Sequence, residues 1–166
     1  LPPDDVSQEV NRQREQYDPL SASYSPAHIT VTQPLSNKPD QKAWKKIISV
    51  IGDFPTFKID YGPLRSFLPY PCIWYQVQPA EMVLAVREAL HGTGLFNMTQ
   101  GYIEDFVPHL TITEGQSGPE VTEALLEELQ AASGTGSFIC KELAFIVPDH
   151  NFKFHAERLV PFGDSK

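Results

Sequence analysis

A five-residue phrase occurs twice in this chain. Residues 28 to 32 are His-Ile-Thr-Val-Thr, and residues 109 to 113 are His-Leu-Thr-Ile-Thr. Polar and aliphatic residues alternate with a period of two in both phrases, which predicts a β-strand in each. One face of each strand then carries a histidine and two threonines, while the other face contacts a hydrophobic core. The sequence therefore predicts two motif strands, at about 27 to 33 and 107 to 113.

The elements around the two phrases follow the same order. The phrases are 81 residues apart, and the same offset carries the helix predicted after the first phrase onto the helix predicted after the second. Proline at the start and glycine or proline at the end delimit the helices, which are predicted at 3 to 16, 39 to 52, 79 to 92 and 119 to 133. The other β-rich stretches are 56 to 67, 72 to 78, 137 to 147 and 152 to 160. We expect one α+β domain over residues 1–166, with two interleaved lobes.

The paired phrases suggest chemistry at phosphorus. If the lobes pack about a pseudo-twofold axis, His28 and His109 face one cleft. Histidine has an ordinary pKa of about 6.5, so a pair can supply a neutral general base and a protonated general acid together. The hydroxyls of Thr30 and Thr111 can donate hydrogen bonds to phosphate oxygens, and this chemistry requires no metal ion. Threonine is also intrinsically favoured in strands, which explains Thr32 and Thr113 equally well; which histidine is the base stays open here.

Other candidate groups have simpler interpretations. His91 at a helix C-terminus and His150 in a turn are predicted to be structural, and His155 in the last strand is assigned no function. Each phrase offers one strong metal ligand and no second ligand at a suitable spacing, which disfavours a zinc site. Cys72 and Cys140 are predicted to be core residues. We expect no metal and no cofactor.

The composition of the chain limits the classes of binding partner that it favours. The formal net charge is −8, which argues against a broad grip on a long nucleic acid but leaves a small nucleotide or an RNA terminus as substrate. No apolar run approaches the length of a membrane helix, and no leader pattern opens the chain, so we expect a cytoplasmic protein without membrane contact. The oligomeric state is not indicated.

The residues resemble the two-histidine (2H) phosphoesterase superfamily, whose mark is a pair of His-hydrophobic-Thr/Ser-hydrophobic motifs on symmetric lobes. Residues 26 to 31 and 107 to 112 match these motifs, and residues 14 to 19, Arg-Glu-Gln-Tyr-Asp-Pro, resemble the branch of 2'-5' RNA ligase-like proteins. The resemblance implies a bilobal α+β fold of two antiparallel sheets flanked by helices, with a central cleft. It also implies a metal-independent cyclic phosphodiesterase acting on 2',3'-cyclic phosphates, with His28 and His109 as the acid/base pair and Thr30 and Thr111 as phosphate ligands.

The resemblance also implies a β-strand before the first helix. This chain opens at Leu1-Pro2-Pro3 and continues almost directly into a helix, so we expect that strand to be missing. The chain is then a fragment or processed form, or a neighbouring segment fills the place of the strand; an edge left exposed would favour association. Two other functions remain open from the sequence. One is a non-catalytic nucleotide- or phosphate-binding module that uses the same cleft, and the other is a structural part of an assembly.

Overall fold

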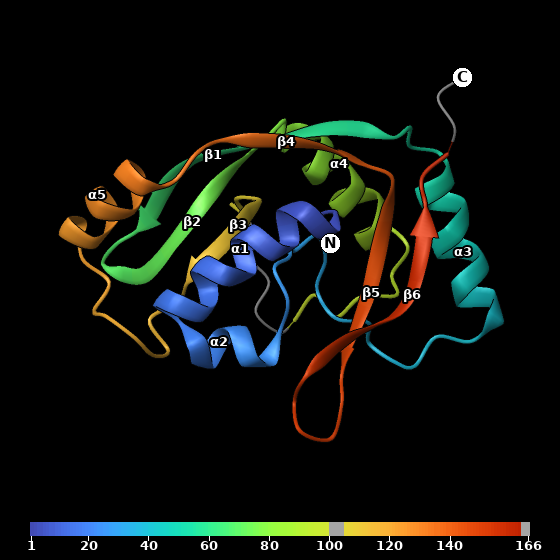
Figure 1. Ribbon diagram of the computed structural model, residues 1–166. Coiled ribbons are helices and arrows are strands. Elements are labelled where there is room, and N and C mark those ends of the chain that lie inside the picture. Colours follow the sequence, from blue (N-terminus) through green and yellow to red (C-terminus); the bar gives the residue numbers. More distant parts are fainter. Residues whose placement is uncertain (100–104, 164–166) are drawn as a thin grey trace.

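The computed structural model describes residues 1–99 and 105–163 and shows two antiparallel sheets flanked by helices (Figure 1). The elements are α1 (Asp4–Tyr17), α2 (Pro19–Tyr24), α3 (Gln41–Gly52), β1 (Phe57–Phe67), β2 (Tyr70–Gln78), α4 (Ala80–His91), β3 (His109–Thr113), α5 (Glu123–Ala132), β4 (Gly136–Cys140), β5 (Glu142–Pro148) and β6 (Phe154–Pro161). The larger sheet has the strand order β3-β2-β1-β4, and β5 pairs with β6. The predicted α+β fold class is confirmed.

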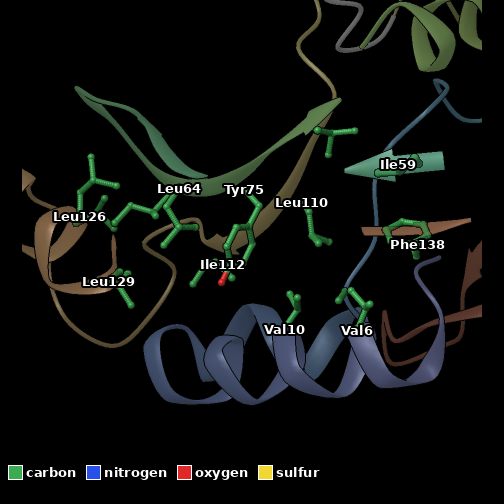
Figure 2. Packing of buried hydrophobic residues seen from close by; sticks show 14 of the residues in the cluster. Val6, Val10, Ile59, Leu64, Tyr75, Leu110, Ile112, Leu126, Leu129 and Phe138 are labelled. Carbon is green, nitrogen blue, oxygen red and sulfur yellow. The ribbon is translucent and has the colours of Figure 1, made fainter. Parts of the chain in front are cut away.

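One face of the larger sheet is packed against α1. Leu64, Tyr75 and Leu110 lie opposite one another in register on β1, β2 and β3. Figure 2 shows them on the side of the sheet that faces Val6 and Val10 of α1, and all five side chains are at most 7% exposed. Full burial of a side chain of this size stabilises the fold by about 1.5–3 kcal/mol, so this contact determines which residues of each strand point inward. The residues that precede and follow Leu64, Tyr75 and Leu110 along their strands point to the opposite face of the sheet.

A second hydrophobic cluster lies under the smaller sheet. It joins Ile47 and Ile51 of α3 to Val86 and Leu90 of α4 and to Val160 of β6. Helix α3 lies alongside β6, and α5 is at the other end of the molecule (Figure 1). Each sheet therefore has its own hydrophobic core. No helix in the described part of the chain has the length and apolar content needed to cross a membrane.

Helix α2 was not predicted from the sequence. Proline at position 19 indicated the end of the first helix and a following loop, but Asp18 ends α1 and at the same time caps α2. Its carboxylate accepts a hydrogen bond from Ser21 N at 3.3 Å, and Pro19 occupies the first helical position. Helix α5 begins at Glu123 rather than near 119, because Thr122 is its N-cap and accepts from Leu125 N at 3.2 Å.

The two motif strands differ from the prediction. The second begins at His109, not at 107, since Pro108 has no N–H to donate. The first is not a regular strand over 27 to 33, and its strand pairing is a single antiparallel bridge between Ile29 and Leu110. Side chains of α4 bind backbone groups of this segment that a neighbouring strand would otherwise bind. Arg87 Nη1 donates to Val31 O at 2.9 Å, and His91 Nε2 accepts from Gln33 N at 3.3 Å.

Candidate active site

The two histidine phrases lie side by side, joined at Ile29 and Leu110. These two residues form an antiparallel bridge, and residues opposite each other in such a pair project to the same side. Leu110 is in the hydrophobic core, and Ile29 packs against that core. Successive residues of an extended chain alternate between two sides. The residues next to Ile29 and Leu110 in the sequence therefore project together to the side away from the core. Those neighbours are His28, Thr30, His109 and Thr111.

Both imidazoles are held in the same way. His28 Nδ1 lies 2.8 Å from Pro26 O, and His109 Nδ1 lies 2.6 Å from Val107 O. A carbonyl oxygen can only accept, so Nδ1 carries the hydrogen in both rings and Nε2 is the nitrogen that gains or loses a proton. In each case the acceptor is two residues before the histidine. These backbone carbonyls therefore favour the same tautomer in both histidines, with the hydrogen on Nδ1.

The surroundings of His28 favour its neutral form. Burial is the main cause of the lowered pKa of His28, and the nearby positive charges of Arg14 and His109 lower it further. The hydrogen bond to Pro26 O acts in the opposite direction but does not restore the ordinary value. At pH values above this lowered pKa, including pH 7, His28 is therefore mainly neutral and its Nε2 has a free electron pair.

His109 is surrounded by aromatic rings. The Phe67 ring meets it edge to face at 5.2 Å between ring centroids, while Trp74 lies at 5.6 Å and Phe106 at 6.2 Å. Phe67 is itself stacked on Trp74, at 4.6 Å and 29°. These contacts limit the rotation of the His109 ring and fix the direction of its Nε2.

The four threonines of the two phrases do not have equivalent surroundings. Thr111 is 8% exposed and follows His109 on the same strand face. Thr113 is 0% exposed, and its hydroxyl accepts from Gly115 N at 3.0 Å and lies 3.5 Å from an Asp18 carboxylate oxygen. Thr113 therefore stabilises the turn after β3, whereas Thr32 lines a cavity near His28.

Arg14 supports β3 from behind. Its side chain is 2% exposed, and Nη1 donates to Thr111 O at 3.1 Å. Nη2 donates to Ser25 O at 3.2 Å and Ser21 O at 3.3 Å, at the end of the segment that leads to His28. Burial lowers the pKa of the Arg14 guanidinium, with Glu114 and Asp18 acting in the opposite direction. One buried cation thus contacts the backbone of both halves of the site.

Asp18 anchors the loop that follows β3. The carboxylate is 0% exposed and accepts from Glu114 N at 2.9 Å, Gln116 N at 3.3 Å and the Ser117 hydroxyl at 2.9 Å. Burial alone would raise the pKa of Asp18, but these hydrogen bonds and the one from Ser21 N together lower it. Arg14 and Asp18 were singled out from the sequence only as part of a family-like stretch, and no local sequence signal indicates the burial of Arg14 in the polar helix α1 or of Asp18 at its end.

Arg87 links the first phrase to the surroundings of the second histidine. Besides its hydrogen bond to Val31 O, its guanidinium carbon lies 4.3 Å from the centre of the Phe106 ring, which packs near His109. The side chain is 4% exposed. Arg87 of α4 therefore contacts the first phrase directly and the second histidine through Phe106.

A cavity of about 770 Å³ adjoins the first phrase. His28, Thr30 and Thr32 line it, together with apolar side chains of β5 such as Phe145 and with His155 of β6. His109 and Thr111 do not belong to its lining. The cavity therefore lies to one side of the histidine pair, and the structure brings His155 to the cavity rather than between the two imidazoles.

The remaining candidate groups lie away from the pair. His150 is in the β5–β6 turn, with Asn151 Nδ2 3.0 Å from its Nε2. Burial raises the pKa of the Cys72 thiol to about 12 and also raises that of Cys140, and both thiols are free. Among residues 1–99 and 105–163, no three His, Cys, Asp or Glu side chains are grouped so that they could hold a metal ion.

Comparison with known proteins identifies relatives along most of the chain. The model of the 2'-5' RNA ligase superfamily matches residues 2–151. A "Putative phosphoesterase" of Bacillus cereus (strain G9842) is 30% identical over 123 residues, which cover 72% of this chain and 69% of the relative. A "Putative phosphoesterase" of Bacillus anthracis (strain A0248) is 29% identical, with the same shares covered.

A solved structure shares the fold. The protein TT0787 of Thermus thermophilus matches with a TM-score of 0.62 at 12% sequence identity, over 99% of this chain and 96% of that chain. The match to the superfamily model is a match of sequence, whereas the likeness to TT0787 is one of fold. The matched residues include both histidine phrases. The chain therefore belongs to the 2'-5' RNA ligase superfamily, among the two-histidine phosphoesterases.

Proposed function

We propose that the protein hydrolyses 2',3'-cyclic phosphates of nucleotides or RNA ends, with two histidines as general acid and general base and no requirement for a metal ion. The observation that carries the proposal is the pairing of His28 and His109 on one side of the Ile29–Leu110 bridge, each with Nδ1 bound to a carbonyl. Superfamily membership and the names of the Bacillus relatives support a phosphoesterase.

His28 is suited to be the general base. Its lowered pKa keeps it neutral near pH 7, so Nε2 takes a proton from the attacking water. As the new P–O bond forms, the bond from phosphorus to the 2'- or 3'-oxygen breaks, and protonated His109 gives its Nε2 proton to that oxygen. The product is a phosphate monoester with a free neighbouring hydroxyl. Loss of a proton from His28 to solvent and uptake of one by His109 restore the starting state.

The threonines next to the histidines complete the proposed site. Thr30 and Thr111 project to the same side as the imidazoles, and their hydroxyls donate to the non-bridging phosphate oxygens. Donors aimed at oxygens that gain charge in the transition state typically contribute about 10² to 10³ in rate each. The threonines hold the phosphate between the base and the acid.

The direct experiment is to incubate the protein with each of the four nucleoside 2',3'-cyclic monophosphates in the presence of EDTA and to separate the products by chromatography. We expect turnover of at least one nucleotide. No turnover of any of them in EDTA, with activity appearing on addition of a divalent metal, would contradict the proposal. Calorimetric binding of a nucleoside monophosphate, without turnover under any condition, would instead identify a non-catalytic binding module.

Substitution of the histidines tests their functions. His28→Ala and His109→Ala should each lower kcat by about 10² to 10⁴ without changing the free energy of unfolding by more than about 1 kcal/mol. His150→Ala, in the β5–β6 turn, is the control and should retain activity. Since the base must be neutral, kcat/KM should rise with pH through the lowered pKa of His28, below the ordinary value of about 6.5. An acidic limb centred above 6.5 would argue against His28 as the base.

A further inference from the structure

The face of the larger sheet opposite α1 carries a row of side chains that begins at His109. Gln76 lies directly opposite His109 on the neighbouring strand, so the two side chains are adjacent on that face. Trp74 pairs with Thr111 on one side and with Arg65 on the other. Because residues two apart on a strand share a face, these residues lie on the same face as His109. Arg65 is thus connected to the histidine through Gln76.

Arg65 presents a positive charge at this face. Its side chain is exposed, and Nε donates to Gln76 Oε1 at 3.3 Å. Ion pairs in the described part of the chain join Arg12 to Glu9 and Lys58 to Asp60, and no described carboxylate pairs with Arg65. In a protein with a net charge of −8, an exposed guanidinium without a carboxylate partner beside the site is complementary to an anion.

An aromatic surface lies beside this cation. The half-buried Phe67 ring is stacked on Trp74 at 4.6 Å and meets His109 edge to face at 5.2 Å. Proteins that bind single-stranded nucleic acids combine cations that contact the backbone with aromatic rings on which bases stack. This face offers both kinds of group. Among its described residues Lys58 is paired with Asp60, whereas Arg65 has no carboxylate partner, which fits a short RNA end rather than a long polynucleotide.

We propose that Arg65 binds the phosphate one nucleotide upstream of the cyclic phosphate, so that the enzyme prefers RNA ends to single nucleotides. This proposal rests on the function proposed above. Two strand spacings, about 10 Å, separate the backbone of β3 from that of β1, so there is room at Arg65 for a second phosphate beside one held at His109. Gln76 lies between them, and its Oε1 orients the guanidinium.

The test compares a dinucleotide that ends in a 2',3'-cyclic phosphate with a nucleoside 2',3'-cyclic phosphate. Arg65→Ala should lower the ratio of kcat/KM for the dinucleotide to that for the mononucleotide by about tenfold, mainly through KM, as expected for the loss of one charged hydrogen bond. Arg65→Lys should recover part of this ratio. Arg12→Ala removes the same charge from the exposed surface of α1 and should leave the ratio unchanged.

A binding measurement separates this proposal from the proposed function. Fluorescence anisotropy with a labelled dinucleotide 3'-phosphate needs no turnover, and Arg65→Ala should weaken this binding about tenfold and reduce the slope of log K against log salt by about 0.7. If no cyclic phosphate is hydrolysed but this difference is observed, the proposed function fails and the Arg65 contact stands. A substrate ratio and a salt slope that Arg65→Ala leaves unchanged, or that Arg12→Ala changes equally, would overturn the proposal.

Discussion

Replacement of Asp18 by alanine should destabilise the protein well beyond the loss of a helix cap. The carboxylate caps α2 through Ser21 N and also accepts two 2.9 Å hydrogen bonds, from Glu114 N and from the Ser117 hydroxyl. Loss of a cap costs about 1 kcal/mol. A hydrogen bond to a charged group contributes about 1.5 to 3 kcal/mol, and we take the lower value because Ser117 is only half-buried. The expected loss in free energy of unfolding is about 4 kcal/mol, a large share of the roughly 5 to 15 kcal/mol typical of a domain.

The assay is urea unfolding of wild type, Asp18→Ala and a matched control, followed by circular dichroism. Asp40 provides the control, because it caps α3 by accepting from Ala43 N at 2.7 Å but is itself exposed. Asp40→Ala should therefore cost only about 1 kcal/mol. If Asp18→Ala costs no more than Asp40→Ala, the hydrogen bonds to the 114 to 117 loop do not stabilise the fold and the reasoning is wrong.

The stability of the protein should depend on pH through the Asp18 carboxylate. The pKa of Asp18 is lowered in the folded protein, so its stabilising contribution is fully present above the unfolded value of about 3.9 and is lost as pH falls through the lowered value. Asp18→Asn keeps a good helix cap but cannot ionise. The difference in free energy of unfolding between wild type and Asp18→Asn should therefore be constant near pH 7 and should shrink below about pH 4. A difference that grows on acidification would contradict the assignment.

Three further predictions concern the core, a turn and the cysteines. Ile112→Ala should lower the free energy of unfolding by about 2–5 kcal/mol, because its side chain is 0% exposed under α1; a loss below about 1 kcal/mol would argue against this core. Gly118→Ala should cost about 1–3 kcal/mol, since φ is 83° and a Cβ would overlap Tyr17 O, whereas Gly134→Ala, with open space around it, should be nearly neutral in the same unfolding assay. At about pH 8 a disulfide reagent should label Cys72 slowly in the folded protein and rapidly in denaturant, because its folded pKa is about 12; rapid labelling of native protein would refute its burial.

Most helices were predictable because their boundaries are local. Helix α4 begins after Pro79 and ends before Gly92, as the sequence indicates. The apolar residues of α3 stand at helical spacing, and of these Ile47 and Ile51 are buried whereas Ile48 is exposed. The exception, α2, has a start signal in Asp18, but the same residue also ends α1. A single position with two functions is ambiguous in sequence and clear only when its hydrogen-bond partners are known.

The first motif strand shows where a local pattern is insufficient. Residues 28 to 32 alternate as a strand does, but a strand also needs a neighbour along its length, and here the ladder is one bridge at Ile29. The hydrogen bonds from Arg87 and to His91 involve a helix more than 50 residues later, with sequence separations of 56 and 58, so no window of the sequence contains them. Arg14 and Asp18 are likewise recognised as supports of β3 only through partners 97 and 96 residues away.

The sequence by itself determined which groups are candidates for the chemistry and how they alternate, because the identity and period of residues are local properties. It identified His28 and His109 as a pair and Thr30 and Thr111 as their neighbours. Tertiary structure alone decided that the two phrases meet at Ile29 and Leu110, that both Nδ1 atoms are bound to carbonyls, and that burial and nearby charge lower the pKa of His28. Proximity and burial depend on how distant segments pack, and packing is a property of the whole chain.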